Sequence, residues 1–600
     1  MINKNGVESC SRCILVKGKS AHSLLASLVM SLLCFVLGVT WINQAIAQEF
    51  GAPELVNGPL DPLEDVGALG SNFQVSPSGN EVFYSTTDGS DGSISLFRRS
   101  LVDDSVQRIT SVSRIFEDRN SFIPRLDLHG FSSDGARLIY RVRLLSTSSS
   151  EVDRQDDFFS LPVAGGVPSR IVDLLANNIA GSVLVGRDRI YFASRVGSAL
   201  VDTLNSVSNN GGAITVLANT PTPSGEVTFT SIRQLLESPD GNQLIYLTNS
   251  FRSSESSFID LFTVPTDGSL APLRLTPANL FGQVQVGVTS ANMFRITNDS
   301  RRVIFTLGTD ENFSADQLYS APIAGGTPLR LDNQSLANGD ISTLLLSPDS
   351  SRVVYQQRLS DTTDSSVQVF SVPVIGGTVV PLTPIIGANI QGISPDSQNL
   401  LYLSDQLTDG TTEAFVVPLT GGLPRRVNSD LTPGGDLVNT VRGHRFTPDS
   451  TRIVYQADQV TDGEVEFFVA PVSGGPIVKL GIPSSQTVGV FGISFDFTSD
   501  SNWLIYITFP TSLDDGISEL FAVDLVGGAP IRLNDQLPFG SEGVGFVSID
   551  QANQRIFYIA DQNVFDQFEL FSVDIPQPEN EESEFFVIPI QGRGAVVVPL

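Results

Sequence analysis

The chain has 600 residues, of which 41% are hydrophobic, and its 65 acidic and 36 basic side chains give a net charge of −29. This apolar fraction excludes a wholly disordered protein. A strongly negative field repels nucleic acid and anionic membrane surfaces, so neither is an expected partner. Cationic partners and metal ions remain compatible with the charge.

The N-terminal segment has the organisation of a secretory signal peptide. A basic region up to Lys19 precedes the apolar run Leu24–Val39, and the small residues Ala45 and Ala47 follow at the two positions that signal peptidase recognises. This order predicts a signal peptide over residues 1–47 with cleavage before Gln48, and hence an exported, periplasmic or extracellular protein. The run is short for a membrane span, which takes roughly 20 residues, although an uncleaved anchor helix is the alternative. No later stretch is a transmembrane candidate, and all three cysteines precede the cleavage site.

One stretch, Phe446–Leu480, holds the pattern that organises the chain. Its sequence contains a TPDS turn before the apolar run IVY, and a glycine pair between the runs FFVAP and IVKL. Short β-rich runs bounded by Gly, Pro, Asp and Ser predict strands and turns. Similar stretches recur about every 50 residues, a period typical of propellers and solenoids. The copies of the turn begin at Ser76, Ser132, Val185, Ser238, Thr297, Ser347, Ser394, Thr447, Thr498 and Ile549.

A glycine pair between two apolar runs follows many of these copies, as in LYSAPIAGGTPLRL from Leu318. The pair supplies the positive φ angles that a tight hairpin needs. Each unit therefore has four strands: A before the SPDG-type turn, B after it, C before the glycine pair and D after it. Four repeated antiparallel strands predict an all-β protein, a β-propeller of about ten four-stranded blades. The blades form either one large ring or two smaller rings.

The ends of the repeat region predict how the propeller closes. Ala52–Asn57 resembles the strand D segment Ala529–Asn534, so the chain begins with a strand D that the last unit can adopt. Such closure removes exposed sheet edges. The propeller repeats span residues 48–576. Residues 577–600 form an acidic linker and a C-terminal hairpin, which either closes a blade or is a separate tail.

The S/T-P-D-G/S turn, the following [LIV]-[LIV]-Y strand and the L-F-x-V-P strand with its glycine pair resemble the WD40-like (PD40) repeats of TolB-like β-propellers. The resemblance covers roughly residues 50–576. It implies a periplasmic propeller that binds partners in an envelope complex, although no counterpart of the N-terminal α/β domain of TolB is found. Related propellers also gate serine peptidases or act as oligosaccharide lyases, so the fold alone does not decide the activity.

Candidate catalytic residues are few. No G-x-S-x-G elbow is present. After cleavage two histidines remain, His129 and His444, both predicted in strand A, which lines the central channel of a propeller. A pair of channel histidines could bind a metal or act as a base. Alternatively, each histidine fills a blade position where other units carry another residue.

The loops between strands B and C are rich in acidic residues. In an antiparallel blade these loops share one face with the D–A loops, so that face should be acidic. Oxygen-rich loops could hold Ca²⁺, which takes six to eight oxygen ligands, although no loop has a full D-x-[DN]-x-[DN]-G pattern and solvated hairpins are the alternative. The candidate metal ligands stand at equal offsets in two units: Asp405, Asp409 and Glu413, and Asp458, Asp462 and Glu466.

These observations predict an exported, non-catalytic propeller that binds a protein, small-molecule or glycan ligand in the cell envelope, without a required cofactor. The binding surface is expected on the acidic face or at the channel mouth, because variable loops on a rigid scaffold carry binding residues. The alternative is a metal-dependent carbohydrate lyase or hydrolase that acts in the channel.

Overall fold

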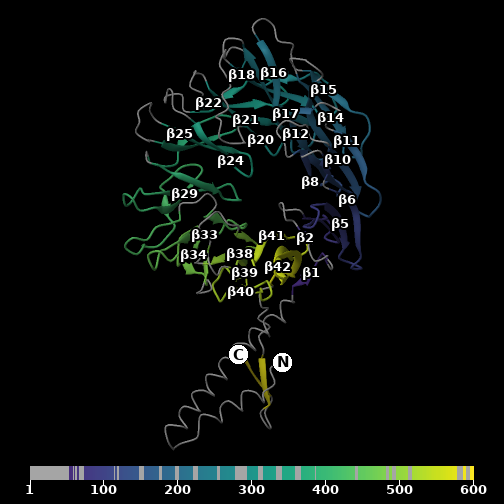
Figure 1. Ribbon diagram of the computed structural model, residues 1–600. Coiled ribbons are helices and arrows are strands. Elements are labelled where there is room, and N and C mark those ends of the chain that lie inside the picture. Colours follow the sequence, from purple (N-terminus) through teal and green to yellow (C-terminus); the bar gives the residue numbers. More distant parts are fainter. Residues whose placement is uncertain are drawn as a thin grey trace, which may run out of the picture. The chain divides into compact units, whose positions relative to one another are not determined.

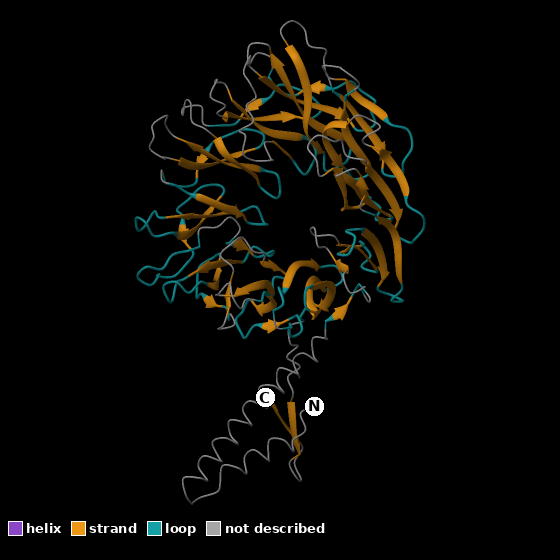
Figure 2. Ribbon diagram, viewed as in Figure 1, coloured by secondary structure: helices purple, strands orange, loops and turns teal. Residues whose placement is uncertain are grey.

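The protein is all-β, and the described residues contain no helix (Figure 2). The predicted signal peptide lies outside the described residues, and among these no helix is long and apolar enough to cross a membrane. The computed structural model describes residues 53–57, 60, 64–66 and 73–576, apart from 114, 118–119, 147–154, 174–178, 196–201, 220–226, 253–256, 278–293, 309–314, 333–340, 359–366, 385–386, 439–442, 482–485, 489–494, 511–516 and 539, and also the strands 585–589 and 595–599.

Ten antiparallel sheets follow one another along the unit Leu55–Ser572, each with its strands in the order A to D. Blade 1 has β2 (Glu64–Val66) and β3 (Phe73–Val75) at the strand A position, then β4 (Glu81–Asp88), β5 (Ile94–Ser100) and β6 (Val106–Val112); blade 2 has β7 (Ile115–Glu117) beside β8 (Asn120–Phe131), β9 (Arg137–Ser146), β10 (Gln155–Pro162) and β11 (Ser169–Asp173); blade 3 has β12 (Ile179–Val185), β13 (Arg189–Ser194), β14 (Thr203–Ser208) and β15 (Thr215–Asn219).

The middle of the ring is regular. Blade 4 has β16 (Val227–Glu237), β17 (Gln243–Arg252), β18 (Ser257–Pro265) and β19 (Leu273–Arg274); blade 5 has β20 (Phe294–Ile296), β21 (Arg302–Gly308), β22 (Ala315–Pro322) and β23 (Leu329–Arg330); blade 6 has β24 (Ile341–Leu346), β25 (Arg352–Arg358), β26 (Val367–Pro373) and β27 (Val380–Pro381); blade 7 has β28 (Asn389–Ile393), β29 (Asn399–Ser404), β30 (Glu413–Pro418) and β31 (Arg425–Arg426).

The last blades complete the unit. Blade 8 has β32 (Arg445–Phe446), β33 (Arg452–Ala457), β34 (Glu466–Pro471) and β35 (Val478–Lys479); blade 9 has β36 (Gln486–Val488) and β37 (Phe495–Phe497) beside β38 (Trp503–Pro510), then β39 (Glu519–Asp524) and β40 (Ile531–Arg532); blade 10 has β41 (Val544–Asp550), β42 (Arg555–Val564), β43 (Gln567–Asp574) and, as its outer strand, β1 (Glu54–Leu55).

The ten blades form a single ring, so the arrangement in two smaller rings is excluded. Apolar clusters join neighbouring blades around the ring, for example Leu403 of blade 7 with Tyr455 of blade 8. Blades 9 and 10 are joined by the side chain of Gln551. Its Oε1 accepts the N–H of Ser499 and its Nε2 donates to the carbonyl of Phe497, both at 2.7 Å. Figure 1 shows strands such as β8, β20 and β24 toward the hole and β6, β11 and β15 on the outside.

The predicted closure of the ring by the N-terminal strand D is confirmed. The N–H of Val56 donates to the carbonyl of Leu570 at 2.7 Å, and the N–H of Leu570 donates to Oδ1 of Asn57 at 2.6 Å. Blade 9 contains the same two bonds. The N–H of Leu533 donates to the carbonyl of Leu520, and the N–H of Leu520 donates to Oδ1 of Asn534. Val56 also lies in one apolar cluster with residues of blades 1 and 10.

The SPDG-type turns add a second link between blades. In several copies serine replaces the last glycine and keeps its positive φ, as at Ser397 (φ 65°). A side chain in this region costs on the order of 1–2 kcal/mol. The hydroxyl offsets part of this cost, because Oγ of Ser397 accepts the N–H of Asp349 in the preceding blade at 2.9 Å. The same bond joins Asp396 to Ser450 and Asp449 to Ser501.

The smaller unit includes residues 573–600. Its strands β44 (Phe585–Pro589) and β45 (Ala595–Pro599) pair antiparallel. The two strands form a sheet of their own. The outer position of blade 10 is occupied by β1.

Candidate binding site

The blades give the ring two unlike faces. The A–B and C–D turns of each blade lie on one face, here called the turn face. The B–C and D–A loops lie on the other, here called the loop face. This division follows from the antiparallel order of four strands in every blade. The sequence analysis placed the candidate acidic residues on the loop face.

The acidic side chains of the B–C loops form equivalent pairs in blades 7 and 8. Asp405 and Asp458 brace their own loops, because their carboxylates accept the N–H groups of Gly410 (3.4 Å) and Gly463 (2.9 Å). Asp409 and Asp462 lie four positions further on, at the exposed loop tips.

The remaining pair, Glu413 and Glu466, forms ion pairs with cations of the same blade. Glu413 is buried and forms an ion pair of 2.9 Å with Arg426 on strand D, and Glu466 pairs with Lys479 in the same way at 2.5 Å. Among the described residues no three His, Cys, Asp or Glu side chains are grouped so that they could hold a metal ion. The structure thus explains four of the six predicted ligands by local bonds, and a calcium site in these loops stays a prediction.

The two candidate channel histidines have different surroundings. His444 precedes β32 and is fully buried. Its Nε2 lies 2.7 Å from the carbonyl of Val438, and its Nδ1 lies 3.3 Å from the backbone N of Gln456. Since a backbone N–H can only donate, Nδ1 accepts and Nε2–H donates to Val438. Burial lowers the pKa of His444 to about 4, so the ring is neutral and fills a blade position.

His129 lies on the inner strand β8 and is exposed. It is the extra residue of a β-bulge, because Leu128 pairs with Tyr140 while Gly130 pairs with Ile139. A bulge turns a side chain away from the regular ladder. The prediction of a histidine pair therefore reduces to one accessible residue, His129.

Replacing His444 by leucine should lower the free energy of unfolding at pH 7 by about 1–3 kcal/mol, because the carbonyl of Val438 and the N–H of Gln456 lose their partner. The folded pKa is depressed, so the wild type should lose up to about 3 kcal/mol as the pH falls from 7 to 4. His444→Leu should lack this loss. Urea unfolding at several pH values tests both effects, and His129→Gln, a change at an exposed residue, should match the wild type at pH 7.

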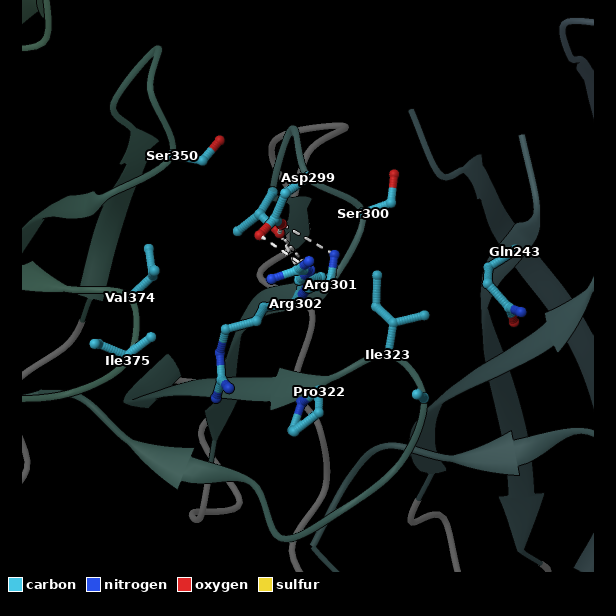
Figure 3. Close-up of a pocket in the computed structure, with 12 residues that line it drawn as sticks. Gln243, Asp299, Ser300, Arg301, Arg302, Pro322, Ile323, Ser350, Val374 and Ile375 are labelled. Atoms are coloured by element: carbon cyan, nitrogen blue, oxygen red, sulfur yellow. Dashed lines mark hydrogen bonds and ion pairs between the residues drawn. The ribbon is translucent and has the colours of Figure 1, made fainter. Parts of the chain in front are cut away.

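Pockets between neighbouring blades open on the turn face, where the sequence analysis placed no candidate residue. One pocket, with a volume of about 500 Å³, lies between blades 5 and 6. Figure 3 shows Val374 and Ile375 of blade 6 across from Pro322 and Ile323 of blade 5, with Arg302 between them. A second pocket of about 480 Å³ lies between blades 6 and 7 and shares Val374 and Ile375 with the first. Both volumes lie within the range of ligand sites, about 300–1,000 Å³.

Polar groups around these pockets come from the SPDG-type turns. Asp299 accepts the hydroxyl of Thr297, and Arg301, whose side chain is 83% exposed, approaches Asp299 at 3.9 Å. Arg302, which lines the first pocket, donates through Nε to Oγ of Ser320 at 2.6 Å. Burial lowers the pKa of this guanidinium, which is still charged at neutral pH. The pockets thus combine aliphatic walls with a polar rim.

Exposed aliphatic side chains gather on the same face. The six most exposed large apolar side chains of the described residues all lie in C–D turns: Val102 (74%), Val167 (85%), Leu270 (69%), Ile375 (73%), Leu423 (93%) and Val526 (72%). Side chains scattered singly need no explanation, whereas a contiguous apolar surface indicates an interaction site. Of these six, Ile375 adjoins both pockets.

A signal in the sequence could have revealed this surface. The residues that flank the glycine pair of a C–D turn are uncharged in all seven blades with such a pair, although 17% of the chain is charged and turns are usually polar. These residues are Ala164 and Val167, Asn210 and Ala213, Ala324 and Thr327, Ile375 and Thr378, Thr420 and Leu423, Ser473 and Pro476, and Val526 and Ala529.

No family model and no curated protein matches the sequence. Solved structures that resemble the chain include a TolB from Agrobacterium tumefaciens, at 18% identity over 44% of this chain and 83% of that one, with a TM-score of 0.24. An oligogalacturonate lyase from Vibrio parahaemolyticus is 11% identical over 66% and 99% of the chains, with a TM-score of 0.31. A prolyl endopeptidase is 12% identical over 64% and 54%, with a TM-score of 0.32.

These scores carry no argument about function. The sheet topology of the chain itself defines its class, which is a β-propeller of ten blades closed by its N-terminal strand.

Proposed function

We propose that the protein is an exported, non-catalytic binding protein of the TolB-like, WD40-like repeat type, which holds a polypeptide partner of the cell envelope against its turn face. The observation that carries this proposal is the pair of adjoining pockets that share Val374 and Ile375. The side chain of Ile375 is exposed between them. A partner with two aliphatic side chains could place one in each pocket and cover Ile375.

The geometry favours a partner that is a chain rather than a single small molecule. The pockets are neighbours on equivalent blades, so a segment that crosses the blades meets the same kind of site twice. Aliphatic side chains in such pockets gain about 25 cal/mol per Å² of buried apolar surface. The exposed side chain of Arg301 beside the first pocket offers an acidic residue of the partner a salt bridge.

The experiment compares two faces of the ring. A photo-crosslinking amino acid at position 375 should give a discrete crosslinked partner in intact cells, because this position lies between the pockets. The same amino acid at position 407 should not, since Leu407 is also exposed (61%) but lies in a B–C loop of the loop face.

Ile375→Asp should reduce recovery of that partner at least tenfold, because it places a charge against apolar walls, whereas Leu407→Asp should leave it unchanged. Equal crosslinking from both positions would contradict the proposal. Crosslinking from position 407 alone would favour the loop face, where the acidic residues lie.

A second candidate is an enzyme that acts in the central channel as a metal-dependent carbohydrate lyase or hydrolase. Its support is the exposed His129 on an inner strand. In that case His129→Gln should abolish turnover of an oligosaccharide, with a divalent metal ion supplied, and leave crosslinking from position 375 intact. If a folded His129→Gln variant lost both oligosaccharide turnover and crosslinking from position 375, the binding proposal would be contradicted.

A further inference from the structure

Blade 2 has an unusual charged surface beside its inner strand. On one face of the blade, Leu126 and Val142 pack in an apolar cluster with blade 1. Alternate residues of a strand point to opposite faces. Arg125 and Asp127 therefore face blade 3, together with their direct strand partners Arg143 and Arg141.

The charges on this face do not balance. Arg125 and Arg143 stand directly opposite each other, an arrangement that is unfavourable for like charges. Both donate to the single carboxylate of Asp127, Arg125 through Nε at 3.1 Å and Arg143 through Nη2. Arg141 is satisfied separately by two bonds of 2.7 Å to Asp156. Two guanidinium groups thus share one carboxylate in a chain whose net charge is −29.

Two further features favour the binding of an anion beside these arginines. Nε of Arg143 is buried and has no hydrogen-bond partner among the described residues. The bulge leaves part of the His129 side chain exposed beside these charges. Burial of the rest, together with Arg141 and Arg143, lowers the pKa of His129, against the effect of Asp127. Strand β12 of blade 3, which packs against the apolar part of this face, contains no ionisable residue.

The surface is specific to blade 2. Counted back from the SPDG-type turn, blade 7 has Asn389 and Gln391 where blade 2 has Asp127 and His129, and blade 8 has the buried His444 in place of His129. Other blades therefore form without these charged side chains, so the propeller fold itself does not require them.

We propose that Arg125, Arg143 and His129 form a binding site for an oxyanion group, the carboxylate or phosphate of a ligand that enters the central channel. Arg125 is accessible, with 49% of its side chain exposed, whereas Arg143 is 21% exposed and is held by Asp127. Guanidinium groups bind carboxylate and phosphate through charge-assisted, often bidentate hydrogen bonds. The site is independent of the pockets on the turn face.

The test uses His129 as the reporter in the full chain labelled with ¹³C-histidine. Inorganic phosphate and malonate are titrated separately at constant ionic strength, and His129→Gln assigns the resonance. The His129 signal should shift saturably with at least one probe, and its pKa should rise, because a bound anion favours the imidazolium form. The probe that binds more tightly distinguishes a phosphate from a carboxylate ligand. The signal of the buried His444 should stay in place.

Matched variants show whether the site is specific. Arg125→Gln should weaken binding of the probe at least tenfold. Arg233→Gln, at an exposed arginine on the inner strand of blade 4, should leave the affinity unchanged. Absence of a saturable shift with both probes, or equal weakening by the two variants, would overturn the proposal.

Discussion

Deletion of Pro53–Asn57 is expected to abolish cooperative folding of the ring. These residues hold the outer strand of blade 10, and Val56 is 1% exposed in the cluster between blades 10 and 1. Without them the edge of β43 loses its partner, and unpaired edges promote aggregation. Blade 1 also loses contacts, since Arg99 donates to the carbonyls of Leu55 and Val56 at 2.6 and 2.7 Å. Urea unfolding followed by tyrosine fluorescence should show a broad transition at lower urea, and size-exclusion chromatography should show aggregates.

A point substitution can distinguish the effect of closing the ring from the effect of losing one hydrogen bond within a blade. Asn57→Ala should cost about 1–3 kcal/mol, because the buried N–H of Leu570 loses its acceptor. Asn534→Ala removes the equivalent bond to Leu520 within blade 9 and should have the same local cost. Only Asn57→Ala weakens the junction of the two chain ends, so only this variant should broaden the transition. Equal broadening by both variants would show that closure at blade 10 has no special role.

The fold could be predicted because its information is local. The SPDG-type turns and glycine pairs set hairpins within a few residues of each other, and the similarity of Ala52–Asn57 to Ala529–Asn534 revealed the closing strand. The number of rings was not predictable in the same way. It depends on the angle between neighbouring blades, which results from side-chain packing between them, such as that of Leu403 against blade 8.

The site residues were harder to predict because their exposure depends on contacts that the repeat does not reveal. His129 and His444 both precede their turns by three positions. A bulge exposes His129, whereas His444 is buried and is hydrogen-bonded to two backbone groups. Glu413 and Glu466 resembled metal ligands, but their ion-pair partners lie 13 residues further on, on strand D. Acidic composition alone therefore does not reveal which carboxylates are already paired with a cation in their own blade.

The second large effect is expected for the aromatic side chains that stack within the blades, because they contribute strongly to the free energy of unfolding. In nine blades a tyrosine and a phenylalanine on strands B and C stack, with ring centroids 5.3 to 5.8 Å apart. In blade 8 the pair is Tyr455 and Phe468, which are 0% and 2% exposed. Phe468→Ala should lower the free energy of unfolding by about 3–5 kcal/mol, because it leaves a cavity and removes a stacked ring.

Two matched variants make this test specific, all three being compared by urea unfolding. Tyr455→Phe keeps the ring but removes the hydroxyl that donates to Gln459 at 2.8 Å, so it should cost about 1 kcal/mol. Leu423→Ala, at a side chain that is 93% exposed on the turn face, should change the stability by no more than about 0.5 kcal/mol. A loss below about 1 kcal/mol for Phe468→Ala would show that the stack does not hold the blade. A large loss for Leu423→Ala would mean that the turn face is already covered, because an open surface gains little stability from an exposed leucine.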